Sequence, residues 1–263
     1  ISMSQLAQYI AEKRQQKPIL SMTHVVYGYP SVQESLDWMA TLLEAGADFI
    51  EVQFPFSDPV ADGPTIVAAC HGALHDQTLT VEQCLKDIGQ LGRDFPQARI
   101  ALMSYLNPMY RYGLEKLVKR CAEENILGLI LPDLPYEQAG DLREYCAANG
   151  VDPVWLVTPV TPKDRLAFLA SEARGFLYCV ARSGVTGNSN HNGGPQQSLD
   201  EYLAEINEHS NAPIGVGFGI REKAHVGALK GKADVAIIGS ALLDAYNKGG
   251  KEEGLKLFNS LFN

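Results

Sequence analysis

Two acidic residues stand in one short stretch of the chain, in different surroundings. Glu51 lies in an apolar run, residues 47–52, that is typical of a buried strand, and Asp62 follows in a loop constrained by three prolines. A buried carboxylate costs several kcal/mol of desolvation unless another group compensates it. Two carboxylates in different surroundings can hold different pKa values and divide acid and base catalysis. The structural alternative is a core glutamate paired with an arginine, plus an aspartate in a turn.

The length and composition are those of an ordinary globular protein. The chain has 263 residues, of which 46% are hydrophobic and 20% charged, so we expect one domain, residues 1–263, with a substantial core. The 22 lysines and arginines against 31 acidic residues give a net charge of −9. Nucleic acid and anionic membranes need a positive surface, so we expect neither as a partner. Backbone amides can still bind a small anion such as phosphate.

The cysteines and histidines indicate neither disulfides nor a metal site. The five cysteines are odd in number and form no C-x-x-C pair, as in reduced thiols of a cytoplasmic protein. The six histidines show no metal-ligand spacing. The first residues show no signal pattern, and no apolar run reaches the roughly 18 residues that a membrane helix needs. We therefore expect a cytoplasmic protein.

Short apolar runs alternate with longer amphipathic segments eight times along the chain. The runs are nearly continuous, as in a parallel sheet that is covered on both faces. They predict strands at residues 19–26, 48–53, 99–104, 127–131, 153–157, 175–180, 213–217 and 234–238. The longer segments predict helices between Ser31 and Gly46 and at residues 81–91, 114–124, 139–149, 163–171, 199–209, 222–229 and 240–247, with extra helices at 4–15 and 252–262.

This alternation predicts an α/β fold, a (β/α)₈ TIM barrel with extra N- and C-terminal helices. The alternative is an open doubly wound sheet. No G-x-G-x-x-G follows the first strand, and the even spacing of the units favours closure.

In such a barrel the active site lies at the carboxyl ends of the strands. Glu51 lies near the end of the second predicted strand, and Asp62 follows on its loop. Glycines and Ser240 follow the seventh and eighth strands, where backbone N–H groups and a helix N-terminus can bind an anion. Residues 182–197 have no apolar periodicity, which predicts either a flexible insertion or a lid over the site.

Five motifs, in the same order along the chain, resemble those of the tryptophan synthase α-chain family. They are Glu51-x-x-x-Pro-Phe-Ser-Asp-Pro-x-Ala-Asp-Gly-Pro-Thr65, Pro132-Asp-Leu-Pro135, Arg182-Ser-Gly-Val-Thr-Gly187, Gly217-Phe-Gly-Ile220 and Gly239-Ser240. The resemblance implies a (β/α)₈ barrel that cleaves indole-3-glycerol phosphate to indole and glyceraldehyde 3-phosphate. It also implies a partner β chain, in a complex of two α and two β chains. Pyridoxal phosphate is then expected in the β chain, and no cofactor in this one.

The resemblance also implies roles for individual residues. Glu51 and Asp62 match the two catalytic carboxylates, and Tyr178 matches a tyrosine beside the first of them. Residues that match phosphate-binding positions are Gly187, Gly219, Gly239 and Ser240, those that match the indole pocket are Phe218, Tyr105, Ile130 and Leu156, and those that match a mobile loop are Arg182 and Thr186.

Two residues depart from the family pattern. Gln53 stands where the better-known members have glycine, and His24 stands where an apolar pocket residue is expected. By strand alternation Gln53 shares a face with Glu51, so we expect it to crowd that carboxylate or to hydrogen-bond with it. Two alternatives therefore stay open: a free-standing lyase that releases indole, and a weakly active barrel that docks to the β chain and activates it.

Overall fold

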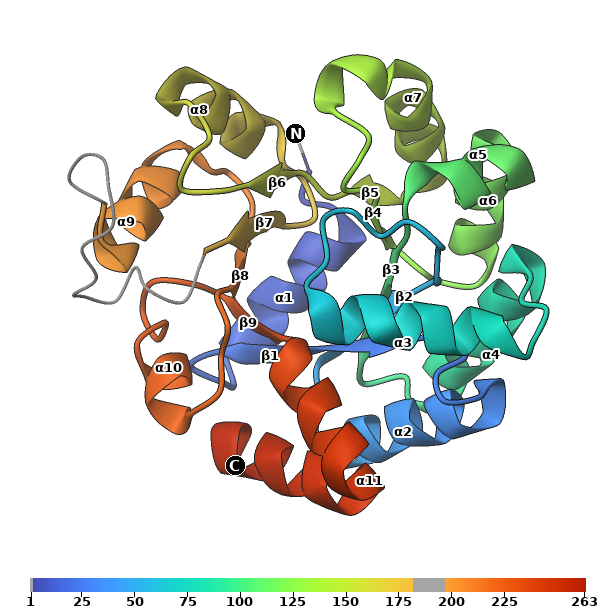
Figure 1. Ribbon diagram of the computed structural model, residues 1–263. Helices are drawn as coiled ribbons and strands as arrows, with labels where there is room; N and C mark the ends of the chain where they lie inside the picture. Colours follow the sequence, from blue (N-terminus) through green and yellow to red (C-terminus); the bar gives the residue numbers. More distant parts are fainter. Residues whose placement is uncertain (1, 182–196) are drawn as a thin grey trace.

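The computed structural model describes residues 2–181 and 197–263, and its strands form one parallel sheet (Figure 1). The strands are β1 (Leu20–Val26), β2 (Phe49–Gln53), β3 (Arg99–Met103), β4 (Gly128–Ile130), β5 (Asp152–Pro153), β6 (Leu156–Val157), β7 (Leu177–Val180), β8 (Ile214–Gly217) and β9 (Val235–Ile238). Their order in the sheet is β5-β4-β3-β2-β1-β9-β8-β7-β6. Every predicted strand is present with small shifts in its bounds, except that the fifth is divided into β5 and β6.

The divided fifth strand closes the barrel. β5 pairs with β4, and β6 pairs with β7. Between them, Val154 N donates to Leu129 O at 2.9 Å, and Tyr178 N donates to Trp155 O at 3.0 Å. The first part of residues 152–157 therefore hydrogen-bonds with β4 and the second part with β7. This segment joins the two ends of the sheet. The predicted (β/α)₈ barrel is confirmed, whereas the prediction of an unbroken strand at 153–157 is wrong. That residues 1–263 form one domain stays a prediction.

Helices surround the sheet as an outer ring (Figure 1). They are α1 (Gln5–Arg14), α2 (Val32–Glu44), α3 (Pro64–His75), α4 (Val81–Asp94), α5 (Leu106–Tyr112), α6 (Leu114–Glu123), the 3₁₀ turn η1 (Tyr136–Gln138), α7 (Gly140–Asn149), α8 (Lys163–Glu172), α9 (Leu199–His209), α10 (Lys223–Gly227) and α11 (Ser240–Phe262). Helix α11 is kinked at Gly249 and Gly250, so it contains both helices predicted near the carboxyl end of the chain.

The N-terminal helix α1 lies across one end of the barrel, in the centre of the ring (Figure 1). Its Leu6 and Ile10 belong to the core cluster inside the barrel, together with residues of β1 and β2. A Cβ added to Gly128 would lie 3.2 Å from Leu6 Cδ2, and one added to Gly175 would lie 2.9 Å from it. These glycines leave room for the Leu6 side chain, so side chains of α1 fill the barrel interior at this end. The site lies at the other end, among the βα loops.

Helix α3 begins directly after Asp62 and was not predicted. The sequence suggested that Pro64 only stiffens the loop, but Pro64 stands in the first turn of α3, where its missing N–H costs no helical hydrogen bond. Ala69, Cys70 and Ala73 form the buried face of this helix. Small side chains of this kind produce a weak apolar pattern, which is why the sequence reading missed the helix. Asp62 is thus anchored between β2 and a helix.

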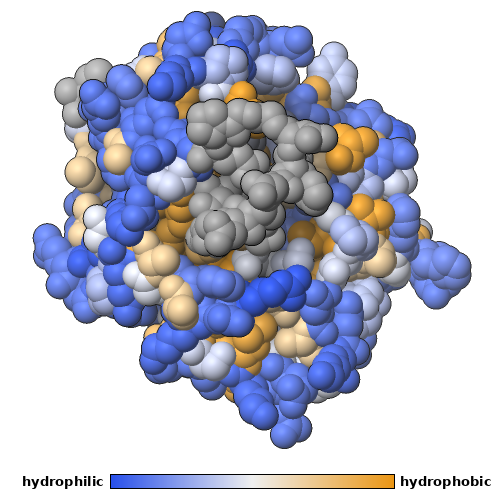
Figure 2. Space-filling view, turned by 60° about the vertical axis from the view of Figure 1, so that its left-hand side comes forward, coloured by the Kyte–Doolittle hydropathy of each residue, from blue (hydrophilic) through white to orange (hydrophobic). Residues whose placement is uncertain are grey.

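Figure 2 turns the side of α9 and α10 toward the reader, and the surface there is mainly hydrophilic, with hydrophobic residues in small separate groups. Within residues 2–181 and 197–263, no helix combines the length and the apolar character that crossing a membrane requires.

Candidate active site

A cavity of about 410 Å³ lies at the carboxyl ends of the strands. The predicted site residues that line it are Glu51, Asp62, Ile130, Leu156, Tyr178, Phe218, Gly219, Gly239 and Ser240. The predicted residues Arg182, Thr186 and Gly187 lie outside the described part of the chain. The wall of the cavity is thus polar where the two carboxylates meet it and apolar at Ile130, Leu156 and Phe218.

Glu51 is a buried carboxylate whose charge is poorly compensated. It lies on β2, its exposed fraction is 3%, and Tyr178 OH donates to Glu51 Oε1 at 3.3 Å. Burial raises the pKa of Glu51 above its ordinary value, and the Asp62 charge adds to this, whereas His24 and the Tyr178 hydroxyl oppose it. Among the described residues, no lysine or arginine pairs with Glu51. The described chain therefore does not support the alternative of a core glutamate–arginine pair.

Tyr178 keeps its proton beside this carboxylate. Burial raises the pKa of its phenol well above the ordinary value, and the neighbouring Glu51 adds to the rise. Tyr178 is therefore a hydrogen-bond donor to Glu51 and not a base.

Asp62 is held by two donors on one of its oxygens. Tyr105 OH and Gln53 Nε2 each lie 2.9 Å from Asp62 Oδ2, and the Ala61 N–H donates to the Tyr105 hydroxyl at 3.1 Å. The Tyr105 O–H is thus directed at the carboxylate. Tyr105, which the resemblance placed in the indole pocket, is 1% exposed and is not among the residues that line the cavity. In this structure the Tyr105 hydroxyl donates its hydrogen bond to Asp62.

Gln53 and His24 form a hydrogen-bonded chain with Asp62. His24 Nε2 lies 2.6 Å from Gln53 Oε1, and the amide group of Gln53 donates to Asp62 Oδ2. Of the two expectations for Gln53, crowding Glu51 or hydrogen-bonding with it, the hydrogen bond is not found among the described contacts. Because β2 ends at Gln53 and the chain then turns back to Asp62, the side chain of Gln53 meets Asp62 instead. His24, on β1, is a buried strand-end histidine that lines the cavity.

Backbone groups from β8 and β9 form the opposite side of the cavity. Gly217 ends β8, Gly219 follows at φ 78°, and Gly239 is the N-cap of α11, whose first residue is Ser240. A helix N-terminus presents free N–H groups and a positive dipole end to an anion. These residues can therefore hold a phosphate group through their backbone.

The chain matches the family model of the tryptophan synthase alpha chain over residues 10–260. The chain belongs to this family. It is 38% identical to the tryptophan synthase alpha chain of Desulforapulum autotrophicum, over 97% of this chain and 99% of that one. It is 39% identical to that of Desulfotalea psychrophila, over 93% and 94%. The resemblance that the five motifs predict is confirmed, and the chain is a lyase of tryptophan biosynthesis.

Solved structures support the same assignment. A structure of Mycobacterium tuberculosis tryptophan synthase superimposes with a TM-score of 0.88 at 32% identity, covering 99% of this chain and 97% of that one. Tryptophan synthase subunit alpha from Legionella pneumophila has a TM-score of 0.83 at 27% identity, covering 99% and 97%. These family members share the barrel across its whole length.

Arg221 is a cavity residue that the sequence reading missed. It follows the Gly217-Phe-Gly-Ile220 motif directly and lines the cavity, and its Nη2 lies 3.6 Å from Asp244 Oδ2. The sequence reading named one basic residue, Arg182, among its candidate site residues. The position of Arg221 directly after a glycine-rich strand end is the signal that could have identified it. In the described part of the chain, no cluster of three or more His, Cys, Asp or Glu side chains could hold a metal ion.

Proposed function

We propose that this chain cleaves indole-3-glycerol phosphate to indole and glyceraldehyde 3-phosphate. The observation that carries the proposal is one cavity with two carboxylates in unlike settings. Glu51 is buried with a raised pKa, and Asp62 accepts two hydrogen bonds on one oxygen. Two carboxyl groups that differ in this way can divide acid and base roles.

In the proposed mechanism the carboxyl group of Glu51 donates a proton to indole C3. The ring then carries positive charge, which the Asp62 carboxylate stabilises at the indole N–H. The bond between C3 and the glycerol carbon breaks, and its electron pair returns to the ring. At the same time the hydroxyl on that carbon loses its proton to Glu51, and the aldehyde forms. Positioned proton transfers of this kind contribute roughly 10²–10⁴-fold each.

The other predicted roles remain part of the proposal. Gly187, Gly219, Gly239 and Ser240 bind the phosphate through their backbone, which orients the substrate. Phe218, Ile130 and Leu156 line the indole pocket. Arg182 and Thr186, which lie outside the described residues, keep the substrate-binding role that the resemblance implies.

A β chain is the proposed partner, in a complex of two α and two β chains. Indole is a small apolar product that diffuses away unless an acceptor takes it up. Val60, Tyr110 and Val160 are 84%, 70% and 89% exposed, and all three lie on segments that follow strands at the carboxyl end of the barrel. Exposed apolar side chains at this end support docking there. The pyridoxal phosphate of the complex belongs to the β chain. The buried free cysteines support a cytoplasmic location.

The chief alternative is a free-standing lyase, which the location of both carboxylates on one chain favours. The third possibility, a docking barrel with little turnover, rested on Gln53 and His24. These two residues hydrogen-bond toward Asp62, so they hold a catalytic group and do not displace it.

Indole release tests the proposal. The purified chain is incubated with indole-3-glycerol phosphate, with and without the β chain of the same organism, and indole is quantified. We expect slow release by the chain alone, faster release with the β chain, and co-elution of the two chains on size exclusion. Release without co-elution or acceleration at micromolar concentrations would support the free-standing lyase. Absence of release under both conditions contradicts the proposed reaction.

A further inference from the structure

The hydrogen bonds of Asp62 determine how the Gln53 amide is oriented. An ionised carboxylate only accepts hydrogen bonds, so the Gln53 atom 2.9 Å from Asp62 Oδ2 is the amide nitrogen. The amide oxygen then faces His24 Nε2 at 2.6 Å. Since that oxygen can only accept, the hydrogen lies on His24 Nε2.

This arrangement leaves the other ring nitrogen of His24, Nδ1, without a hydrogen-bond partner among the described residues. Nδ1 accepts a hydrogen bond when the ring is neutral and donates one when the ring is protonated. His24 is 7% exposed, and its Nδ1 is buried without a partner among the described residues. Leaving a buried polar atom unsatisfied is unfavourable, so Nδ1 is suited to a hydrogen-bonding group that arrives with a ligand. His24 lines the cavity, so a ligand bound there lies beside its ring.

The position of His24 indicates which part of the substrate it meets. β1 lies between β9 and β2 in the sheet. On the β9 side, a Cβ added to Gly239 would lie 3.5 Å from His24 Cβ. On the β2 side, His24 is the register partner of Glu51. His24 therefore lies between the phosphate-binding backbone and the catalytic carboxylates. In indole-3-glycerol phosphate the glycerol carbons lie between the phosphate and the indole, and their hydroxyls are hydrogen-bond donors.

We propose that His24 recognises the glycerol part of the substrate, with Nδ1 hydrogen-bonding to a glycerol hydroxyl, a group that can both donate and accept. Its Nε2–H, through Gln53, also holds Asp62 in place. This inference rests on the proposed function, and it makes His24 a specificity-determining residue. A site that hydrogen-bonds a substrate hydroxyl rejects the analogue without it, because the buried polar atom of the site is then left unpaired.

The experiment compares two ligands in the Glu51→Gln background, where substrate binds without being consumed. The ligands are indole-3-glycerol phosphate and 3-(indol-3-yl)propyl phosphate, which lacks both hydroxyls, and calorimetry gives their Kd values. We expect His24→Phe to weaken binding of the glycerol compound roughly 3- to 10-fold and to change binding of the propyl compound less than about twofold. Gln53→Met should reduce the preference for the glycerol compound as well, because His24 Nε2 loses its acceptor.

His75→Phe is the matched control, because His75 is exposed and lies at the end of α3 away from the cavity. It should leave both Kd values unchanged. If His24→Phe unfolds, His24→Leu provides the same comparison. Equal weakening of both ligands, or no weakening of the glycerol compound, overturns the proposal. Binding of neither ligand overturns the role of His24 and the proposed substrate together. Binding of both without indole release by the unmodified chain refutes the lyase alone.

Discussion

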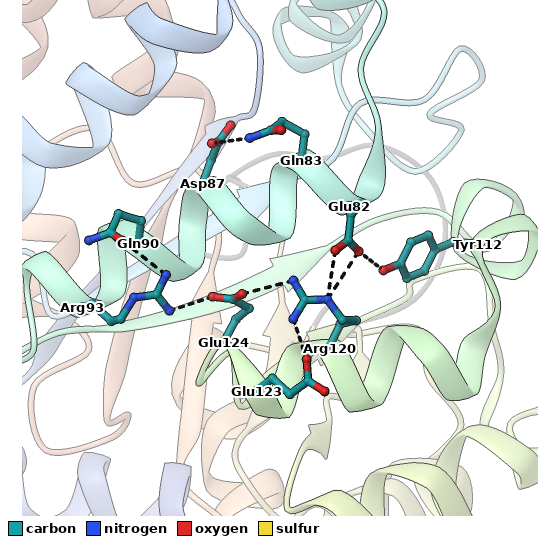
Figure 3. A network of polar contacts seen from close by, with 9 residues as sticks. All are labelled: Glu82, Gln83, Asp87, Gln90, Arg93, Tyr112, Arg120, Glu123 and Glu124. Atoms are coloured by element: carbon teal, nitrogen blue, oxygen red, sulfur yellow. Dashed lines mark hydrogen bonds and ion pairs between the residues drawn. The ribbon is translucent and has the colours of Figure 1, made fainter.

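Two groups of carboxylates in this protein have opposite surroundings. On the outer face of the barrel, Arg120 of α6 donates to Glu82 at 3.2 Å, to Glu123 at 2.6 Å and to Glu124 at 3.1 Å (Figure 3). Figure 3 also shows Arg93 of α4 meeting the second oxygen of Glu124, at 2.7 Å. In the cavity, Glu51 receives one hydrogen bond from Tyr178 at 3.3 Å and pairs with no lysine or arginine among the described residues.

The surroundings decide what each carboxylate can do. Hydrogen bonds from Tyr112 and Arg120 hold the pKa of Glu82 below its ordinary value, so Glu82 stays ionised and links α4 to α6. Burial raises the pKa of Glu51, so this group can carry a proton and release it. The surface glutamates with cationic partners therefore support the fold, whereas the buried Glu51, which pairs with no lysine or arginine among the described residues, is the candidate catalyst.

The largest effect is expected for Glu51→Gln, which keeps the shape and removes the exchangeable proton. Indole release should fall at least about a hundredfold, while the propyl phosphate analogue still binds. Glu82→Gln, the matched change in the surface network, should leave the rate within about twofold. Steady-state kinetics and calorimetry measure both. A Glu51→Gln variant that keeps more than about a tenth of the rate contradicts the assignment.

Asp62→Asn should lower turnover almost as far, because an amide cannot supply the negative charge that stabilises the indole cation. It would also place an amide against the donors Gln53 and Tyr105. Asp58→Asn is the control, since Asp58 is exposed on the same loop, and both are assayed without the β chain. Ordinary kinetics for Asp62→Asn would instead point to Asp58 or Asp133 as the second carboxylate.

Gly219→Val tests the glycine-rich side of the cavity, opposite the two carboxylates, where we propose that phosphate binds. Gly219 has φ 78°, a conformation that valine adopts only with strain, and the added side chain would obstruct the approach of phosphate. We expect KM to rise roughly tenfold with a smaller change in kcat. Gly231→Val is matched for strain, with φ 81°, and has no atom within 4 Å of the added Cβ. Similar KM values for the two variants would argue against a phosphate site at Gly219.

The smallest effect is expected in the pH dependence of stability, with opposite signs for the two glutamates. The folded-state pKa of Glu51 is raised, so ionisation destabilises the fold as pH rises above the ordinary value of 4.5. The stability of Glu51→Gln relative to the unmodified chain should therefore increase with pH. The folded-state pKa of Glu82 is lowered, so its stabilisation is present above 4.5 and is lost as pH falls. Urea unfolding of the unmodified chain, Glu51→Gln and Glu82→Gln between about pH 3 and pH 8 measures both effects. The same pH dependence of stability in all three proteins would contradict these signs.

Much of the site could be predicted from residue types and order. Glu51 and Asp62 stood out because a carboxylate in an apolar run needs a reason to be there. The glycines after the seventh and eighth strands indicated an anion site because such loops recur in barrels. The partner of Gln53 could not be predicted from alternation, which gives the face of a strand and not the contact that a side chain makes after the chain turns. Arg221 was missed because its proximity to the cavity depends on how the segment after β8 folds.

The sequence by itself determined the alternation of strands and helices, the family and the candidate carboxylates, because these depend on local periodicity and on residue order. Only the tertiary structure decided that residues 152–157 bond to both ends of the sheet and that Leu6 fills the barrel beside Gly128 and Gly175. It also decided that His24 hydrogen-bonds with Gln53, and Gln53 with Asp62. These are contacts between segments far apart in the chain or brought together by a turn. Sheet order and register determine these contacts, and neither can be predicted from a single segment of the sequence.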